Sequence, residues 1–332
     1  MVYPRWVMLG IFIALMTIAT NTNAPGSGNL VVVNQFDHSV LLVDPVSHQT
    51  LGKVSVGVNG HEVDVSRDGR FAYVPIYSNV AVGQKGTDGD HVDVVDLREF
   101  KVARSIALGK AVRPHRALFG PDGLLYVSAE LDDALYAVDT RTDKVVAKIP
   151  SGQPETHMFV FSKDGYKAYT SNISAGSVSV LDLKKHSLLS VIPLTKVAQR
   201  ISISVDGRWV FTHDQGQARI AVIDTKTDKL DGWIEIPNVA FASEPTPDGK
   251  WLMALAAGAH KLFAIDLKTR TVSHTFDLPG SSNGIFVSPD GASTFVSCIG
   301  PGKIAVLDMK TWEMLPPIDL SPGVDGMAWS KQ

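Results

Sequence analysis

The chain has 332 residues, of which 45% are hydrophobic and 20% are charged, and it carries a formal net charge of −3. This composition is typical of a globular protein, and it excludes the strongly basic surface that attracts nucleic acid. The length is compatible with two average domains or with one large β architecture.

Residues 1–24 predict a secretory signal peptide. Arg5 precedes the apolar run "WVMLGIFIALMTIAT", and polar "NTNA" follows it, with Ala24 as the expected cleavage point. The run is too short to span a bilayer comfortably, and an uncleaved N-terminal anchor is the alternative. We therefore expect a periplasmic or secreted protein with no stable membrane span after cleavage and a short linker at residues 25–28. Its single cysteine, Cys298, excludes an intrachain disulfide.

A repeated unit follows this segment. An Asp-Gly pair recurs at intervals of 54 residues and then four times 42 residues, at Asp68, Asp122, Asp164, Asp206, Asp248 and Asp290. A second mark, an aliphatic residue followed by aspartate, recurs at Asp44, Asp96, Asp139, Asp182, Asp224, Asp266 and Asp308. We expect these aspartates to serve the turns of the repeat, and we exclude them from any functional site. Seven copies of the unit fill the chain.

Each unit predicts four strands. In one unit they are expected at residues 157–162, 167–171, 177–181 and 188–194, because alternating β-branched residues are separated by turn residues. A period near 42 with four strands is typical of a β-propeller blade. The first unit has only three strands, and residues 324–330 supply the fourth, which closes the ring. The sequence therefore predicts an all-β fold: one seven-bladed β-propeller of four-stranded antiparallel blades over residues 29–332.

The repeat resembles a known family. The segments "GRFAYVP", "GLLYVSAE", "GYKAYTSN" and "GRWVFTHD", each followed by an "xVxVxD" strand, resemble the YVTN-type seven-bladed propellers of exported bacterial proteins. They are also similar to the lactonase-like seven-bladed propellers. This resemblance implies the fold over nearly all of residues 29–332. For function it is less specific, because such repeats occur on binding modules, structural surface proteins, cofactor-processing proteins and enzymes.

The register of the repeat places one residue of each blade at the channel mouth. Seven residues before each Asp-Gly aspartate, with the seventh member added by the same spacing, the ring contains His61, His115, His157, Gln199, Phe241, Asn283 and Asp325. The next position contains Glu62, Arg116, Met158, Arg200, Ala242, Gly284 and Gly326. Residues that only fill loops are expected to be Ser, Gly, Pro or Asn, so the histidines, Glu62 and the two arginines indicate a site.

Loops after the second strands reach the same face. We expect substrate contacts from the loop residues Glu130, His213 and Asp214, in addition to the ring residues Gln199, Phe241, Asn283 and Asp325. The unit that begins at His61 contains an insertion, and His91 at its end is a further expected contact. The insertion is interpreted as a lid over the mouth or a solvated loop, and less readily as a calcium loop because it lacks EF-hand spacing.

Two kinds of chemistry fit this ring. A divalent metal would take its ligands from His61, His115, His157 and Glu62. The expected width of the channel disfavours one ion bound by all three histidines, whereas two adjacent histidines with a carboxylate, such as His61, His115 and Glu62, are easier to bring around one ion. Without a metal, the same residues move protons near neutral pH, while Arg116 and Arg200 bind a carboxylate or an oxyanion. A third interpretation is that these side chains only bond backbone and channel water. The cofactor stays unknown, with a divalent metal ion as a candidate.

We therefore predict a small-molecule hydrolase or isomerase of lactonase-like type that acts on an anionic substrate. Its catalytic residues are predicted to be His61, Glu62, His115, His157, Arg116 and Arg200. The alternative is a non-catalytic module that binds a partner protein, a redox cofactor or a metal through the same face. The expected partners are a small anionic ligand or a periplasmic protein, and the chain is expected to be a monomer.

Overall fold

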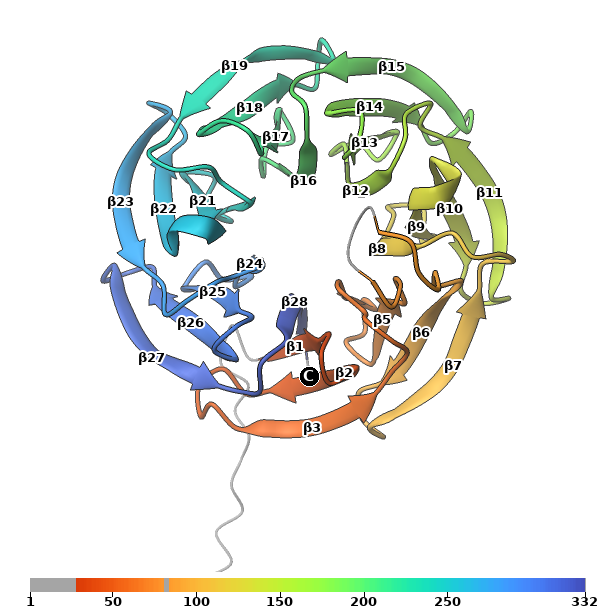
Figure 1. Cartoon of the computed structure of the whole chain (residues 1–332), viewed down its shortest axis with the longest axis horizontal. Helices are drawn as coiled ribbons and strands as arrows, with labels where there is room; N and C mark the ends of the chain where they lie inside the picture. The colour runs from red at the N-terminus through yellow and green to blue at the C-terminus, as the bar shows by residue number, and fades with distance from the viewer. Residues whose placement is uncertain (1–27, 81–83, 332) are drawn as a thin grey trace, which may run out of the picture.

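The computed structural model describes residues 28–80 and 84–331. They form seven four-stranded antiparallel sheets arranged in a ring around a central channel (Figure 1). This confirms the predicted seven-bladed β-propeller. The predicted signal peptide at residues 1–24 and most of the linker at residues 25–28 lie outside the described residues. In the part of the chain that the structure describes, no helix is long and apolar enough to cross a membrane.

The blades follow one another in chain order. The first contains β1 (Asn29–Asn34), β2 (Ser39–Val43), β3 (Thr50–Ser55) and the closing strand β28 (Val324–Ser330). The second contains β4 (Asp64–Val65), β5 (Phe71–Pro75), β6 (His91–Asp96) and β7 (Lys101–Ala107). The third contains β8 (Pro114–Phe119), β9 (Leu125–Ala129), β10 (Ala134–Asp139) and β11 (Lys144–Pro150), with a short 3-10 helix η1 (Glu130–Asp132) after β9.

The remaining blades repeat the pattern. The fourth contains β12 (Thr156–Phe161), β13 (Lys167–Asn172), β14 (Ser177–Asp182) and β15 (Ser187–Pro193). The fifth contains β16 (Ala198–Ile203), β17 (Trp209–Asp214), β18 (Arg219–Asp224) and β19 (Lys229–Glu235). The sixth contains β20 (Ala242–Pro245), β21 (Trp251–Ala256), η2 (Ala257–Ala259), β22 (Lys261–Asp266) and β23 (Thr271–Asp277). The seventh contains β24 (Gly284–Val287), β25 (Ser293–Cys298), β26 (Lys303–Asp308) and β27 (Glu313–Asp319).

The ring closes through its two ends, as predicted. Strand β28 pairs antiparallel with β1, so that Leu30 lies opposite Trp329 and Val31 lies opposite Ala328. The C-terminal strand thereby becomes the innermost strand of the first blade. This pairing joins the two ends of the described chain and leaves no open sheet edge at the channel. It also brings Asp325, from the end of the chain, beside residues of β4 and its preceding loop.

The repeated aspartates serve turns. In the Asp-Gly turn of the fourth blade, the Ser162 hydroxyl donates a hydrogen bond to Asp164 Oδ1 at 2.6 Å, and the same oxygen accepts the Tyr166 N–H at 3.0 Å. Gly165 has φ +71°, a conformation that favours glycine. At the second mark, Asp182 Oδ1 accepts the backbone N–H groups of Lys184 and Lys185. These contacts account for the recurrence of both marks through the geometry of the turns.

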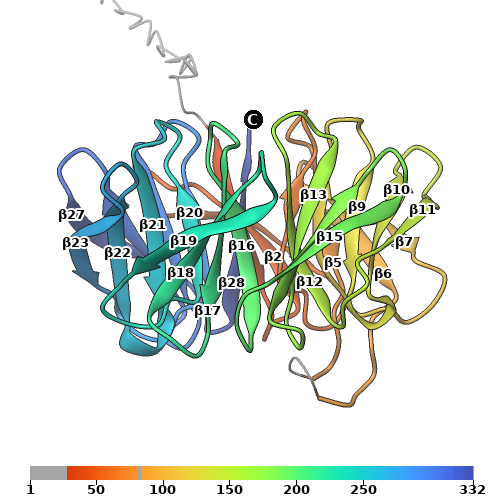
Figure 2. The same ribbon diagram turned by 90° about the horizontal axis from the view of Figure 1, so that it is seen from above.

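The hydrophobic core lies between blades. Seven clusters of buried apolar side chains fill the seven junctions between neighbouring sheets. One of them packs Tyr73 and Val94 of the second blade against Val127 and Tyr136 of the third. Because the sheets pack face to face around the ring, the innermost strands remain free to direct polar side chains into the channel. The ribbon turned by 90° shows the blades standing side by side around the ring, with the described part of the segment between β5 and β6 extending from the lower face (Figure 2).

The insertion between β5 and β6 is fastened to the third blade. Arg113, which is buried, donates two hydrogen bonds to Asp88 Oδ1 at 2.8 and 2.6 Å and a third to the Gln84 carbonyl oxygen at 2.8 Å. The other carboxylate of this loop, Asp90, lies 2.7 Å from His91 Nδ1. Both carboxylates of the expected lid or calcium loop are thus engaged in pairs with basic side chains.

Candidate functional site

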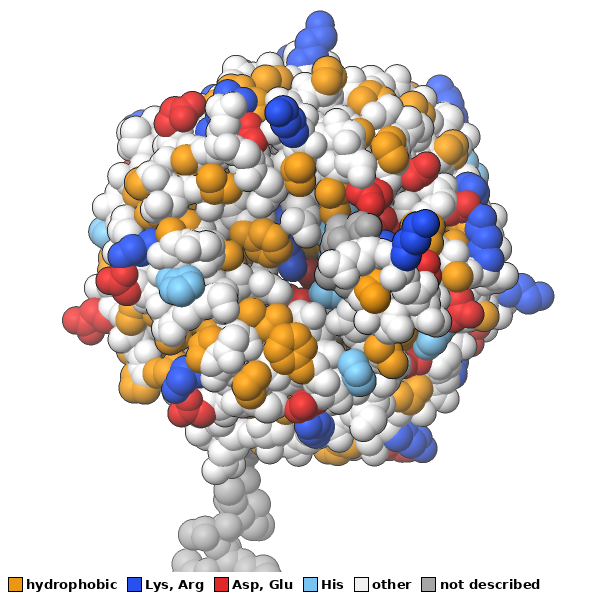
Figure 3. Space-filling view, in the orientation of Figure 1, with side chains coloured by type: hydrophobic (Ala, Val, Ile, Leu, Met, Phe, Trp, Pro, Cys, Tyr) orange, Lys and Arg blue, Asp and Glu red, His pale blue; other side chains and the backbone are white. Residues whose placement is uncertain are grey.

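A cavity of about 790 Å³ occupies the channel mouth. Six of the seven ring residues predicted from the repeat register line it: His61, His115, Gln199, Phe241, Asn283 and Asp325. Loop residues complete its wall, including Gln35, Phe36, Asn59 and Asn79, and Arg200 contributes to it as well. The space-filling view shows this mouth as a hollow at the centre of the ring, with charged side chains at its base (Figure 3). We call it the mouth cavity.

His61 and Asp325 form a hydrogen-bonded pair in the mouth cavity. His61 Nδ1 lies 2.9 Å from Asp325 Oδ2, and the Asp325 side chain is fully buried. The Gln35 amide also donates to Asp325 Oδ2, at 3.0 Å. His61 Nε2 is buried and has no hydrogen-bond partner among the described residues. A carboxylate that holds one imidazole nitrogen leaves the other nitrogen free to accept a proton.

The three ring histidines pack side by side, with the His61 and His115 rings stacked at an interplanar angle of 24° and the His115 and His157 rings tilted at 39°. The ring centroids of His61 and His115 are 5.2 Å apart and those of His115 and His157 are 3.6 Å apart. The Tyr77 ring meets His61 and His115 edge-on at 5.0 and 5.2 Å. From sheet packing we expected a channel so wide that these histidines would lie apart, and their contact differs from that expectation. His157 is completely buried behind His115 and does not line the mouth cavity.

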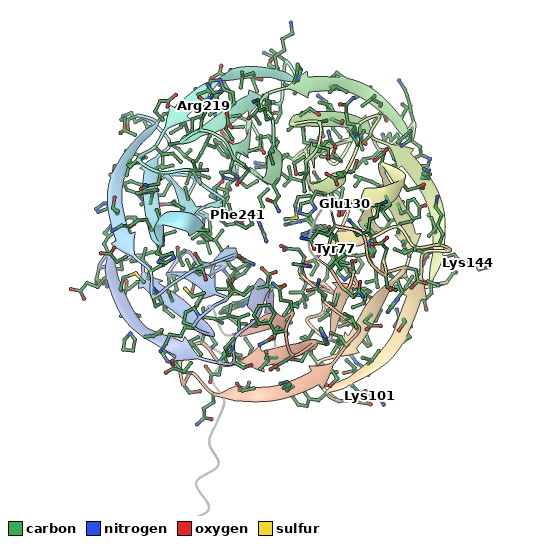
Figure 4. All side chains as sticks on the ribbon, in the orientation of Figure 1. Tyr77, Lys101, Glu130, Lys144, Arg219 and Phe241 are labelled. Carbon is green, nitrogen blue, oxygen red and sulfur yellow. The ribbon has the colours of Figure 1, made fainter. Side chains whose placement is uncertain are left out.

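Burial keeps the inner histidines neutral. It lowers the pKa of His115 well below its ordinary value, and the neighbouring His157 and His61 add to this effect. The pKa of His157 is lowered by burial and partly restored by Glu130, whose carboxylate lies 3.6 Å from His157 Nδ1. Figure 4 shows Tyr77 and Glu130 on the same side of the channel, with Phe241 across from them.

A second cavity of about 320 Å³ lies deeper in the channel. All seven residues of the position after the ring line it: Glu62, Arg116, Met158, Arg200, Ala242, Gly284 and Gly326. Asp64 and Glu244, two residues further along their strands, line it as well, because alternate residues of a strand face the same side. Arg200 lines both cavities. We call this deeper space the inner cavity.

Glu62 lies between two guanidinium groups. Arg200 Nη1 donates to Glu62 Oε1 at 2.7 Å, and Arg116 Nη1 lies 3.8 Å from Glu62 Oε2. Arg200 Nη2 also lies 3.7 Å from Asp325 Oδ1. Glu62 and Arg200 are both buried, so their pairing is not screened by solvent. The predicted acid–base residue Glu62 is therefore the ion-pair partner of Arg200 and belongs to the inner cavity.

Four predicted substrate contacts do not line either cavity: Glu130, His213, Asp214 and His91. Asp214 accepts hydrogen bonds from Arg219 at 3.1 and 3.0 Å. His213 is fully buried, and burial lowers its pKa to about 3. Glu130 contacts the stack from behind, through His157. The loops after the second strands therefore supply fewer cavity residues than the sequence suggested.

Sequence reasoning missed Tyr77 and Glu244. Glu244 lies three positions after the ring residue Phe241, so extending the same register would have found it. Its pKa is raised to about 7, mainly by burial and also by Glu62, with Arg116 opposing the shift. Tyr77 lies outside the innermost strands, where the repeat register gives no signal. Gln35 directly follows β1, in one of the loops after the second strands that the sequence placed on this face, and it does line the mouth cavity.

The geometry of the histidines does not suit a metal ion. Within residues 28–80 and 84–331, no three His, Cys, Asp or Glu side chains are grouped so that they could hold a metal ion. The stack presents ring faces to one another, whereas a metal needs ring nitrogens that converge on one point. The arrangement therefore does not fit the divalent metal ion that the sequence suggested, for which the candidate ligands were His61, His115, His157 and Glu62.

No protein-family model matches the sequence, and neither does any curated protein. Solved structures do resemble the chain. Hydrazine synthase from Kuenenia stuttgartiensis matches with a TM-score of 0.72 and 18% identity, over 90% of this chain and 99% of that chain. The dihydro-heme d1 dehydrogenase NirN, in complex with DHE, matches with a TM-score of 0.68 and 19% identity, over 94% and 77%. A protein of unknown function from Desulfotomaculum acetoxidans DSM 771 matches with a TM-score of 0.75 and 13% identity, over 91% and 99%.

These likenesses concern the fold. At 13 to 19% identity, they show that the chain shares the propeller architecture with proteins of different activities. The YVTN-type and lactonase-like families remain a resemblance of the repeat segments, which no sequence match supports. The function therefore has to be argued from the channel itself.

Proposed function

We propose that the protein is a small-molecule hydrolase or isomerase that acts on an anionic substrate in the mouth cavity. The observation that carries this proposal is the His61–Asp325 pair, with 2.9 Å between Nδ1 and Oδ2 and an unpartnered Nε2 among the described residues. A volume of about 790 Å³ is in the range of ligand sites in proteins. The pair thus places an oriented imidazole in a space that accommodates an organic substrate.

His61 acts as the general base in this proposal. Its Nε2 accepts a proton from a water molecule, and the resulting hydroxide attacks the carbonyl carbon of a lactone or ester. The buried Asp325 carboxylate stabilises the imidazolium, which then returns the proton to the leaving oxygen as the ring opens. In an isomerase the same nitrogen removes a proton next to a carbonyl group. No Ser, Thr or Cys side chain lines the described part of the mouth cavity, which favours water or the substrate itself as the reacting partner.

Arg200 binds the anionic group of the substrate. Its guanidinium has five N–H donors, of which one is used at 2.7 Å by Glu62, and its Nε is buried without a partner among the described residues. It also lies over the Phe241 ring, with 5.1 Å from Cζ to the centroid, which fixes its plane. The amide side chains of Gln199 and Asn283 line the same cavity and would orient the remainder of the substrate.

The test compares turnover of a panel of lactones by the wild type and by His61→Gln. The expected result is ring opening by the wild type and loss of turnover in the variant, with unchanged thermal unfolding. The matched control is His38→Gln, which makes the same substitution at another histidine in the wall of the mouth cavity. This control should retain turnover, because His38 has no contact with Asp325. Equal activity of His61→Gln and wild type on every hydrolysed lactone would overturn the assignment of the base.

A second candidate is binding of a flat redox cofactor without turnover. The size of the mouth cavity and the aromatic side chains Phe36 and Phe241 in its wall favour it. NirN, a structural neighbour, is described as a dihydro-heme d1 dehydrogenase in complex with DHE, and that ligand is stated of NirN alone. Titration with hemin distinguishes the candidates: a saturable change in the visible spectrum that is lost in His61→Gln supports cofactor binding, whereas no change supports the hydrolase or isomerase.

A further inference from the structure

The inner cavity contains an arginine, Arg116, that has no carboxylate within hydrogen-bond distance among the described residues. Arg116 approaches Glu62 Oε2 only to 3.8 Å, and its other contact is with Met158 Sδ at 3.9 Å. Arg116 Nε is buried and has no hydrogen-bond partner among the described residues. Because a guanidinium binds carboxylates through parallel N–H donors, an incompletely paired and mostly buried arginine in a cavity wall is a strong anchor for an anion.

The carboxyl groups around Arg116 are engaged or weakly ionised. Glu62 is paired with Arg200 at 2.7 Å. Asp64 accepts the backbone N–H groups of Val65 at 2.9 Å and Phe119 at 3.0 Å, so both of its oxygens are used. Glu244 has a pKa raised to about 7, so that near neutral pH it is protonated in about half of the molecules. In its protonated form Glu244 is a hydrogen-bond donor and does not repel a second anion.

Apart from the ionisable groups and Ser243, the side chains of the wall are apolar. Met158, Ile201, Ile285 and Phe286 line the inner cavity together with Trp329, whose ring stacks at 6.3 Å from the Phe286 ring. A charged group alone would leave this surface in contact with water, whereas a ligand with a short hydrocarbon tail would cover it. The cavity thus combines one cationic anchor, one group able to donate a proton in a hydrogen bond, and an apolar wall.

We propose that the inner cavity is a second ligand site, distinct from the mouth cavity, that binds a short-chain monocarboxylate through Arg116 with Glu244 as a proton-bearing hydrogen-bond donor. The hydrocarbon tail of the ligand lies against Trp329, Phe286 and Met158. This site does not depend on the reaction proposed for the mouth cavity, because Arg116 and Glu244 line only the inner cavity.

The pH dependence follows from the groups around Glu244. These are Glu62, Asp64, Arg116 and Arg200, all of which line the same cavity. Since the ionised ligand binds the form in which Glu244 is protonated, the apparent affinity is highest at mildly acidic pH, where the ligand is still ionised, and falls above about pH 7. Between pH 6 and pH 8 the linkage amounts to about a tenfold loss of affinity.

Calorimetric titration of the full chain with sodium butyrate tests the proposal. The wild type is expected to bind at pH 6, more tightly than it binds acetate, and about tenfold more weakly at pH 8. Arg116→Gln is expected to lose about tenfold or more in affinity. Arg219→Gln is the matched control: its side chain is 25% exposed, against 23% for Arg116, but it lies at the periphery and pairs with Asp214 (Figure 4).

Two further variants keep the test decisive. Glu244→Gln, which retains a donor but cannot ionise, is expected to bind butyrate equally at pH 6 and pH 8. Ala242→Leu fills the inner cavity without changing a charge and is expected to abolish binding. The proposal is overturned if the wild type does not bind butyrate at pH 6, or if folded Arg116→Gln and Ala242→Leu both bind it as the wild type does. An effect of His61→Gln on turnover with no butyrate binding would leave the mouth-cavity function standing and reject this site alone.

Discussion

The two cavities of the channel share Arg200 but differ in how their ionisable groups are paired. In the mouth cavity, Asp325 holds His61 at hydrogen-bond distance and Gln35 holds Asp325, so the imidazole has a fixed orientation. In the inner cavity, Arg116 is 3.8 Å from the nearest carboxylate of Glu62, and no partner fixes its guanidinium as firmly among the described residues. A chain of close hydrogen bonds is suited to proton transfer, whereas an incompletely paired charge is suited to binding. We therefore propose chemistry at the mouth and recognition in the interior.

Replacing Asp325 by Asn should have the largest effect on this comparison. The variant keeps the size of the side chain but favours the wrong imidazole tautomer, and turnover of any lactone that the wild type opens should fall by about 10⁴-fold. Asp93→Asn is the matched control, because Asp93 is a buried, hydrogen-bonded aspartate that lines neither cavity. Comparable losses in the two variants would show that the effect is structural.

Glu62→Gln should have the next largest effect, and on stability. It leaves the buried Arg200 guanidinium without a charged partner at 2.7 Å, and removing one member of a buried ion pair costs about 3–5 kcal/mol of unfolding free energy. Urea denaturation measures this loss. Joint replacement of Glu62 by Leu and Arg200 by Met should recover most of it. If Glu62→Gln leaves the denaturation midpoint unaltered, the Glu62–Arg200 pair does not contribute to stability as we expect.

Glu244→Gln should change stability in a pH-dependent way. The folded-state pKa of Glu244, about 7, is above its unfolded value near 4.5, so the wild type loses stability as pH rises from 4.5 through 7. Allowing for partial exposure to channel water, the variant should be more stable than wild type by about 2 kcal/mol at pH 8. The two proteins should be nearly equal at pH 4.5. Denaturation midpoints at both pH values check this difference, and a constant offset at both would contradict the inferred ionisation.

A turn aspartate should show the smallest effect. Asp164→Ala removes the acceptor for the Ser162 hydroxyl and the Tyr166 N–H, which should cost about 1 kcal/mol of stability. Lactone turnover and butyrate binding should both remain at wild-type levels, because this turn lies at the end of the blade away from the mouth. A selective loss of either activity would place a repeated aspartate in function and remove the distinction between scaffold and site.

The fold and the residues that line the channel could be predicted from the sequence because the repeat has one period. Equivalent residues 42 apart occupy equivalent places in successive blades, so a single register identified the ring at the mouth and the layer below it. The pairing of individual side chains could not be predicted in this way. Asp325 and His61 are 264 positions apart and meet only because β28 closes the ring beside the segment leading into β4.

The direction of individual side chains accounts for the remaining differences between the predicted site residues and their places in the structure. Glu62 follows His61 in sequence, yet period-2 alternation turns it into the inner cavity, where Arg200 pairs with it from across the channel. His115 and His157 approach each other to 3.6 Å between ring centroids, which depends on rotamers that a pattern of residue types does not specify. His213 and Asp214 lie at the predicted face but turn into the blade.

The tautomer of His61 distinguishes a proposed general base from a histidine that only packs. Long-range ¹H–¹⁵N correlation NMR of the histidine rings reports which nitrogen carries the proton and requires no substrate. We expect neutral His61 to be protonated at Nδ1, which donates to Asp325, with Nε2 free, and we expect this preference to be lost in Asp325→Asn. A proton resident on Nε2 in the wild type, or a His61 spectrum unchanged by Asp325→Asn, would contradict this expectation.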